Sequence, residues 1–206
     1  MLLKIFINMH ILFNIFNLLQ IYFNLLYVKI RYNERTIATY FRKQGAKIGK
    51  DCYFQIQWLS YEPYLISIGD HVWISMQVMF HTHDMAHWIS VQKYPRIQSY
   101  GPIKIEDNCF IGRNAQIFHN VTIGRNSIIG ANSVVLTNVP PNSIVMGVPA
   151  RVIGSTLKYI EKYTESLKEQ TPDDFKNPPI EIDTWQWNEK RNSKIIKQHL
   201  ISIFHL

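Results

Sequence analysis

Large aliphatic residues recur every six positions through the middle of the chain, without a break from residue 105 to residue 135. They are Ile105, Ile111, Ile117, Ile123, Ile129 and Val135. Asparagine stands three positions after each of them, and a residue no larger than valine stands one position later. A period of six fits neither an α-helix nor a simple alternating strand. It predicts a three-sided prism of short strands, with the aliphatic residues inside, the smaller residues near the corners, and Asn or Gly in the turns.

Three such hexads form one coil of the prism, so residues 18 positions apart lie above one another, because 3 × 6 = 18. Asn108 is therefore expected above Asn126, and Asn114 above Asn132, as ladders of amides along the stack. Weaker hexads begin at residues 48, 54, 68, 74 and 80.

The register of the hexads is interrupted twice. It slips between about Ser60 and Ile66, and it is lost from His81 to Pro102. We expect the second interruption to form a loop that projects from the prism. Because a repeat coil contacts only its neighbours, such a loop disturbs the stack little and is a frequent place for function.

The N-terminal segment has a different pattern. No charged residue occurs from Ile5 to Val28, a stretch long enough to span a membrane, which takes about 20 apolar residues. Its polar residues are nevertheless spaced to fall along one stripe of a helix. They are His10, Asn14, Asn17, Gln20, Asn24 and Arg31. The pattern predicts an amphipathic helix with a wide apolar face.

The distribution of charge indicates what this helix binds. The chain has 22 Lys and Arg against 15 Asp and Glu, a net charge of +7. Residues 1–50 contain eight basic residues and a single acid, Glu34, so the remainder of the chain is neutral. A basic flank beside an apolar helix favours anionic lipid over nucleic acid. We expect a cytoplasmic protein, peripheral on the inner face of the membrane through residues 1–50; packing on another subunit and spanning the membrane are the alternatives.

These patterns divide the chain into three parts. Residues 1–45 form the apolar helix with its basic flank, residues 46–154 form the prism with the loop 81–102, and residues 155–206 form a helical tail. Within the tail, residues 155–170 read as a helix, 171–179 as a proline-rich linker and 185–206 as a second amphipathic helix. Hydrophobic residues make up 47% of the chain, enough for a packed core, and two cysteines exclude a disulfide scaffold.

Five sequence motifs carry a resemblance to a known family. They are IGDHVWIS (68–75), THD (82–84), GPIKIEDNCFIG (101–112), VTIGRNSIIGANSVV (121–135) and VPPNSIVMGVPARVI (139–153). The chain resembles the hexapeptide-repeat acyltransferases, and within them the sugar and polysaccharide O-acetyltransferases similar to maltose and galactoside acetyltransferase. The resemblance implies an all-β solenoid, a left-handed parallel β-helix, that assembles as a homotrimer.

The same resemblance implies an activity. It is acetyl transfer from acetyl-CoA directly to a hydroxyl of a carbohydrate, in a cell-surface polysaccharide such as capsule, O-antigen or exopolysaccharide, or in its precursor. N-acetylation of a nucleotide-linked amino sugar is the alternative. Carried over by position, His83 is the general base, and a neutral imidazole suits this role near neutral pH.

The resemblance also assigns binding residues. It places coenzyme A contacts at Arg113, Ala131, Thr137 and Arg151, with the backbone N–H near Arg113 facing the oxyanion and Arg151 suited to a phosphate. Thr137 stands where relatives often have lysine. The resemblance implies a further coenzyme contact at Leu136 in the same turn.

Acceptor contacts are expected at Ser75, Asp84 and Trp88. Ser75 stands where the sugar acetyltransferases often have asparagine. Asp84 either orients an imidazole or is solvated, and Trp88 either stacks on a sugar ring or closes the loop onto the prism.

The histidines and cysteines of the chain suggest two other kinds of chemistry, metal binding and nucleophilic catalysis. His81, His83 and His87 have a spacing that suits a metal, as in the prism of gamma-type carbonic anhydrases, but His119 lacks the second histidine five residues away that this type requires. We therefore expect no metal. Cys52 and Cys109 occupy the small inward column of the hexads, which favours buried packing over a nucleophilic role.

Overall fold

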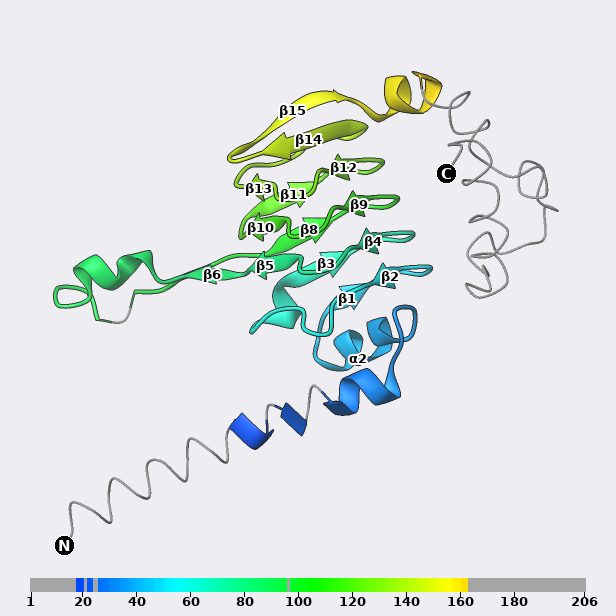
Figure 1. The fold of residues 1–206 in the computed structure, drawn as a ribbon. Coiled ribbons are helices and arrows are strands. Elements are labelled where there is room, and N and C mark those ends of the chain that lie inside the picture. Colours follow the sequence, from blue (N-terminus) through cyan, green and yellow to red (C-terminus); the bar gives the residue numbers. More distant parts are fainter. Residues whose placement is uncertain (1–17, 21, 24–25, 96, 163–206) are drawn as a thin grey trace, which may run out of the picture. The chain divides into compact units, whose positions relative to one another are not determined.

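The computed structural model describes residues 18–20, 22–23, 26–95 and 97–162. The chain winds into a prism whose three sides are parallel β-sheets, stacked coil upon coil (Figure 1). Each complete coil contributes one strand to each sheet, so neighbouring strands of a sheet come from successive coils. The parallel coils predicted from the six-residue period are confirmed.

The three sheets differ in length. The first contains β1 (Lys47–Ile48), β3 (Ile66–Ile68), β8 (Ile103–Ile105) and β11 (Val121–Ile123). The second contains β2 (Tyr53–Phe54), β4 (Trp73–Ile74), β9 (Phe110–Ile111), β12 (Ile128–Ile129), β14 (Ser143–Gly147) and β15 (Ala150–Ser155). The third contains β5 (Met79–His81), β10 (Gln116–Phe118) and β13 (Val134–Val135). β15 runs antiparallel to β14 and ends the stack.

The interior of the prism follows the hexads. Ile111, Ile117, Ile123 and Ile129 are 0% exposed, and so are Ala115, Ser127 and Ser133 in the smaller column. Both cysteines are buried in that column. Burial raises the pKa of the Cys52 thiol, and it raises that of Cys109 to about 11, so neither is a ready thiolate. Their interpretation as packing residues is confirmed.

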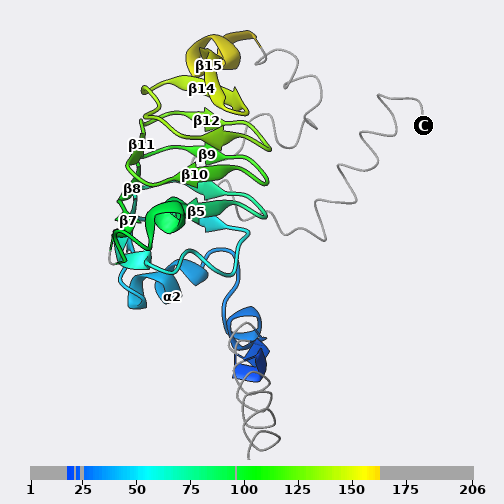
Figure 2. The same ribbon diagram turned by 90° about the vertical axis from the view of Figure 1, so that its left-hand side faces the viewer.

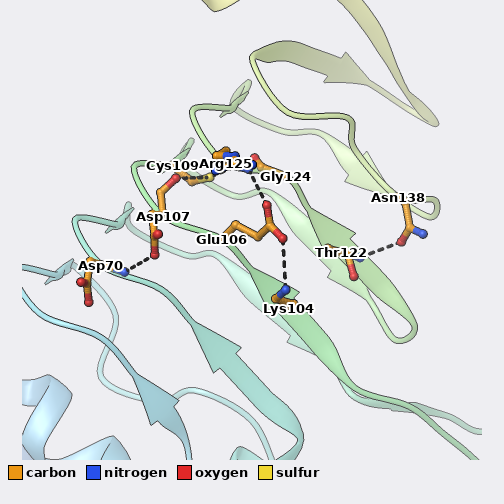
Figure 3. Close-up of polar contacts among 9 residues, drawn as sticks. All are labelled: Asp70, Lys104, Glu106, Asp107, Cys109, Thr122, Gly124, Arg125 and Asn138. Atoms are coloured by element: carbon orange, nitrogen blue, oxygen red, sulfur yellow. Dashed lines mark hydrogen bonds and ion pairs between the residues drawn. The ribbon is translucent and has the colours of Figure 1, made fainter.

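Asparagine occupies the turns because it tolerates the left-handed backbone. Five of the six predicted asparagines have a φ near +60°: Asn108, Asn114, Asn120, Asn126 and Asn132. The ladders form as expected, since the Nδ2 of Asn108 donates to Asn126 Oδ1 at 2.9 Å and the Nδ2 of Asn114 donates to Asn132 Oδ1 at 2.8 Å. Asn138 is the exception: its Oδ1 accepts the backbone N–H of Thr122 at 2.7 Å (Figure 3).

Acidic side chains tie successive coils together at the edge between the first and second sheets (Figure 3). Asp107 Oδ1 accepts the backbone N–H of Asp70 at 2.8 Å. Glu106 accepts hydrogen bonds from Lys104 Nζ and from the Arg125 N–H, each at 3.1 Å, and these hold the pKa of its carboxyl below the usual value. A Cβ on Gly69 would lie 2.1 Å from Asp107 Oδ1, so the close approach of coils requires glycine there.

Helix α2 (Ile37–Lys43) closes one end of the prism. Phe41 is fully buried and its ring centroid lies 5.5 Å from that of Phe54. Residues 18–20, 22–23 and 26–31 are helical, and Val28 belongs to the same core; the rest of the predicted N-terminal helix lies outside the described residues. Among the residues described, no helix is long and apolar enough to cross a membrane.

Both interruptions of the hexads leave the regular path. The first contains the short helix η1 (Pro63–Leu65). The second contains β6 (His83–Asp84), η2 (Ala86–Ser90) and β7 (Ser99–Tyr100), and β6 pairs with β7 as an antiparallel hairpin. This projecting loop stands out from the prism in Figure 1 and points toward the viewer in Figure 2.

The chain separates into two compact units, Met1–Thr156 and Leu157–Leu206. Residues 156–162 are helical, within the predicted helix 155–170. The predicted linker and the second amphipathic helix lie outside the described residues.

Candidate active site

His83 lies where the chain leaves the prism for the projecting loop. Its Nδ1 is 2.8 Å from Glu62 Oε2, and the two side chains are 28% and 13% exposed. The rings of Tyr61 and Tyr100 flank the imidazole at centroid distances of 5.8 and 5.6 Å. When Nδ1–H donates to the carboxylate, the Nε2 of the neutral ring carries the lone pair that a general base requires.

Glu62 is held by a chain of buried hydroxyls. Thr82 Oγ1 donates to Glu62 Oε2 at 2.5 Å, and Ser60 Oγ lies 2.6 Å from the Thr82 hydroxyl. Because Thr82 has one hydroxyl hydrogen, Ser60 is the donor in the second bond. Burial opposes ionisation of Glu62, but the hydrogen bonds from Thr82 and His83 outweigh it and lower its pKa. The carboxylate beside His83 is therefore charged at neutral pH.

The sequence interpretation missed Glu62. The sequence feature that could have indicated it is the slip of the hexad register at residues 60–66. This slip interrupts the coil and brings Glu62 within hydrogen-bond distance of His83. A carboxylate within a break of an otherwise strict repeat is a candidate functional residue for the same reason as a loop histidine.

Asp84, the next residue on β6, binds a second histidine. Its Oδ2 accepts from His119 Nε2 at 2.9 Å, and its Oδ1 accepts the Ala86 N–H at 2.9 Å. Asn120 Nδ2 donates to His119 Nδ1 at 3.1 Å. The bond from His119, with help from Ala86, lowers the pKa of Asp84. Asp84 thus links the root of the loop to the next coil of the prism, which carries His119, and orients that imidazole.

Ser75 lies beside a hollow on the surface of the first coils. It is buried, and its Oγ donates to Gln55 Oε1 at 3.2 Å. The hollow has a volume of about 350 Å³ and is lined by Gln55, Ile56, Gln57, Trp58, Gln77 and Val78. The Trp58 ring lies 5.1 Å from that of Tyr61, which in turn contacts His83. One aromatic side chain therefore links the wall of the hollow to His83.

Trp88 lies on η2 of the projecting loop and is 70% exposed. Its side chain is therefore accessible in the described structure.

The predicted coenzyme contacts fall into separate places. Arg113 and Ala131 occupy equivalent turns of successive coils, after β9 and after β12. Arg113 Nε donates to Gln77 Oε1 at 3.0 Å, and a Cβ on Gly112 would lie 2.6 Å from the Ala131 nitrogen. Both residues lie on the edge between the second and third sheets, which also carries Gln77.

The remaining two coenzyme candidates lie elsewhere. Thr137 is exposed in the turn after β13. This turn lies on the same edge of the third sheet as His119, which follows β10, and as the start of the projecting loop, which follows β5. Arg151 is exposed on β15, and its Nη1 donates to the Ala150 carbonyl at 2.8 Å. The third sheet thus separates His83 and Thr137 from Arg113 and Ala131.

The histidines of the loop region do not converge. His81 Nε2 lies 3.1 Å from Gln116 Oε1, and its ring stacks on Phe118 at 4.6 Å, whereas His83 is bound to Glu62. Within the described part of the chain, no three His, Cys, Asp or Glu side chains are arranged to hold a metal ion.

Known proteins share this architecture. A family model for the bacterial transferase hexapeptide (six repeats) matches residues 102–137. Protein CapG of Staphylococcus aureus is 46% identical over 128 residues, which are 61% of this chain and 74% of CapG. The chain belongs to the hexapeptide-repeat family.

Solved structures agree with the hexapeptide-repeat assignment. A hexapeptide-repeat containing acetyltransferase from Vibrio cholerae has a TM-score of 0.53 and 29% identity, over 66% of this chain and 88% of that one. A galactoside acetyltransferase in complex with coenzyme A has a TM-score of 0.50 and 22% identity, over 69% of this chain and 82% of that one, and shares the fold. This hexapeptide-repeat protein is an acetyltransferase, and its family implies that the prism winds as a left-handed β-helix.

Proposed function

We propose that this chain transfers the acetyl group of acetyl-CoA to a sugar hydroxyl of a cell-surface polysaccharide or its precursor, with His83 as general base. The observation that carries the proposal is the hydrogen bond between His83 and the charged Glu62 at the root of the projecting loop. Glu62 is a positioning residue, since it acts on the substrate through His83.

The geometry supports direct transfer. Glu62 fixes the imidazole with Nδ1–H bound, so that Nε2 accepts the proton of the sugar hydroxyl as its oxygen attacks the thioester carbonyl. The new C–O bond forms, the C–S bond breaks, and the proton passes from Nε2 to the departing sulfur. The Glu62 carboxylate stabilises the imidazolium between these two proton transfers. A positioned base of this kind contributes about 10²- to 10⁴-fold to the rate.

The hollow, which Trp58 and Tyr61 connect to His83, suits a neutral sugar. Gln55, Gln57 and Gln77 present side-chain amides to its interior or rim, and Trp58 offers an apolar ring. Amides donate to and accept from hydroxyl groups, whereas an aromatic ring packs against the apolar face of a pyranose. The six lining residues carry no charge, which favours a hydroxyl acceptor over an ammonium-bearing one.

A homotrimer accounts for the division of the site. Arg113 and Ala131 lie on one edge of the prism and His83 on another, so a second chain is needed to bring the two groups to one cleft. Arg113, Ala131, Thr137 and Arg151 bind the coenzyme in this arrangement, with Arg151 at a phosphate. The exposed Trp88 on the projecting loop reaches toward the acceptor held by the neighbouring chain.

An acceptor screen tests the proposal. The full chain is incubated with acetyl-CoA and a panel of oligosaccharides and amino sugars, and mass spectrometry detects acceptors that gain one acetyl group. We expect transfer to hydroxyls, reduced at least about 100-fold in His83→Ala. The control is His71→Asn, which changes a histidine of a regular turn to the residue that fills most such turns.

Three results would contradict the proposal. They are unchanged transfer by His83→Ala, transfer to amino groups alone, and stoichiometric bound zinc in elemental analysis of the active protein.

A further inference from the structure

Large apolar side chains on the N-terminal helix are exposed to solvent. Their exposed fractions range from 37% for Leu26 to 77% for Ile30. The set is Leu18, Leu19, Tyr22, Phe23, Leu26, Tyr27 and Ile30, which we call the apolar face. So large a run of exposed apolar side chains is a mark of an interaction surface.

The apolar face occupies one side of the helix. At about 100° per residue, its seven positions fall within half of the circumference. Val28 lies on the opposite side and is 2% exposed in the core that also contains Phe41. Gln20 and Arg31 also lie outside the apolar half. Packing on the prism therefore fixes the helix in the orientation that leaves the apolar face outward.

Exposed basic residues follow this helix in the sequence. Lys29 falls just inside the apolar half, near the edge formed by Leu18, and Lys43, Lys47 and Lys50 follow in the sequence as exposed residues of α2 and the first coil. Arg42, by contrast, donates to the carbonyl oxygens of Ile48 and Gly49. Glu34 is the single acid among the first fifty residues of the sequence.

We propose that the apolar face lies in the headgroup region of an anionic membrane, with the neighbouring lysines at lipid phosphates. The combination of an apolar helical face and flanking cations is that of a helix lying in the membrane interface. A second copy of this chain is a poorer occupant, because it would bring a second cluster of the same charge beside the first. The acetyl-transfer proposal is independent of this surface, since the two use different residues.

Vesicle flotation tests the membrane proposal with a matched pair of variants. Phe23→Glu introduces a charge into the apolar face, and Gln20→Glu introduces the same charge three residues away on the polar side. The full-length proteins are floated with vesicles of phosphatidylcholine containing phosphatidylglycerol, and with vesicles of phosphatidylcholine alone. Light scattering gives the molar mass of each variant, and circular dichroism confirms its fold.

The wild-type chain is expected to float with the anionic vesicles and to bind the neutral ones more weakly, by about fivefold for each lysine engaged. Phe23→Glu is expected to lower partitioning about tenfold or more, and Gln20→Glu to lower it much less. Equal loss in both variants, or equal binding to both kinds of vesicle, would overturn the proposal. A molar mass that falls in Phe23→Glu without a change in flotation would assign the face to another copy instead.

Discussion

The regular coils and the two interruptions use similar residues for different ends. Glu106, in a regular coil, accepts from Lys104 and a backbone N–H and ties one coil to the next. Glu62, in the first interruption, accepts from Thr82 and from His83 of the second interruption. Hydrogen bonds lower the pKa of both carboxylates. A strict repeat commits its polar groups to the neighbouring coils, whereas the two breaks bring together a carboxylate and the histidine that we propose as general base.

The largest expected effect is a difference in unfolding free energy between a substitution in a regular coil and the same substitution in the projecting loop. Ile117→Ala removes a fully buried side chain whose strand pairs with the coils on both sides, and is expected to cost about 2–5 kcal/mol of unfolding free energy. Ile89→Ala makes the same change at a 95% exposed position of the projecting loop and is expected to stay within about 0.5 kcal/mol of the wild type. Chemical denaturation followed by circular dichroism measures both.

Comparable losses from the two isoleucine variants would show that the loop is a packed part of the prism and would remove the distinction between the regions. Acetyl transfer per folded molecule provides a second measurement, and it should persist in Ile117→Ala at temperatures where the variant remains folded.

The next effect is a difference in kcat between substitutions of the two carboxylates, Glu62 and Glu106. Glu62→Gln keeps the shape of the side chain but removes the charge that orients and stabilises protonated His83, so kcat should fall about tenfold or more with little change in KM for acetyl-CoA. Glu106→Gln makes the same chemical change in a regular coil, and its kcat should stay within about twofold of the wild type. Steady-state thiol release from acetyl-CoA with a validated acceptor measures both. Equal losses of kcat in both variants would reduce Glu62 to a structural role.

The lowered pKa of Glu62 also predicts a pH dependence of stability. Its folded-state pKa lies below the ordinary value of 4.5, so its stabilising contribution is complete above that pH and is lost as the pH falls through the folded-state value. The difference in unfolding free energy between the wild type and Glu62→Gln should therefore shrink as the pH is lowered from 5 toward about 3, in a denaturation series. A difference that grows on acidification would contradict the assigned charge state.

Periodicity explains which features the sequence could predict. The inward isoleucines, the buried cysteines and the ladder from Asn108 to Asn126 all repeat at fixed intervals, so the position of one determines the others. Asn138 departs from its column because the register shortens there: Val139 bridges to Ile123, 16 residues away instead of 18, and the Asn138 side chain accepts the N–H of Thr122.

Contacts between residues of the two interruptions follow no fixed interval, so the sequence does not predict them. The bond from His83 to Glu62 spans 21 residues and depends on the path of both breaks. The hydrogen bond between His119 and Asp84 likewise depends on the direction in which the loop leaves the prism, and no spacing in the sequence determines that direction. The separation of Arg113 from His83 follows from which turns share an edge of the prism, and this depends on how the strands are divided among the three sheets.

The smallest expected effect tests how far the regular coils depend on their turns. Asn126 has a φ of 57° and links Asn108 to Asn142 through amide hydrogen bonds of 2.9 Å on each side. Asn126→Gly keeps the left-handed backbone without strain but removes both bonds, and is expected to cost about 1 kcal/mol, because the ladder is only partly buried. Asn126→Ala loses the same bonds and adds the left-handed penalty of about 1–2 kcal/mol, so it should be the less stable of the two in thermal denaturation. Equal stability of the two variants would show that Asn126 stabilises the turn through its hydrogen bonds alone. An Asn126→Ala variant as stable as the wild type would show that neither the hydrogen bonds nor the left-handed backbone makes this position depend on asparagine.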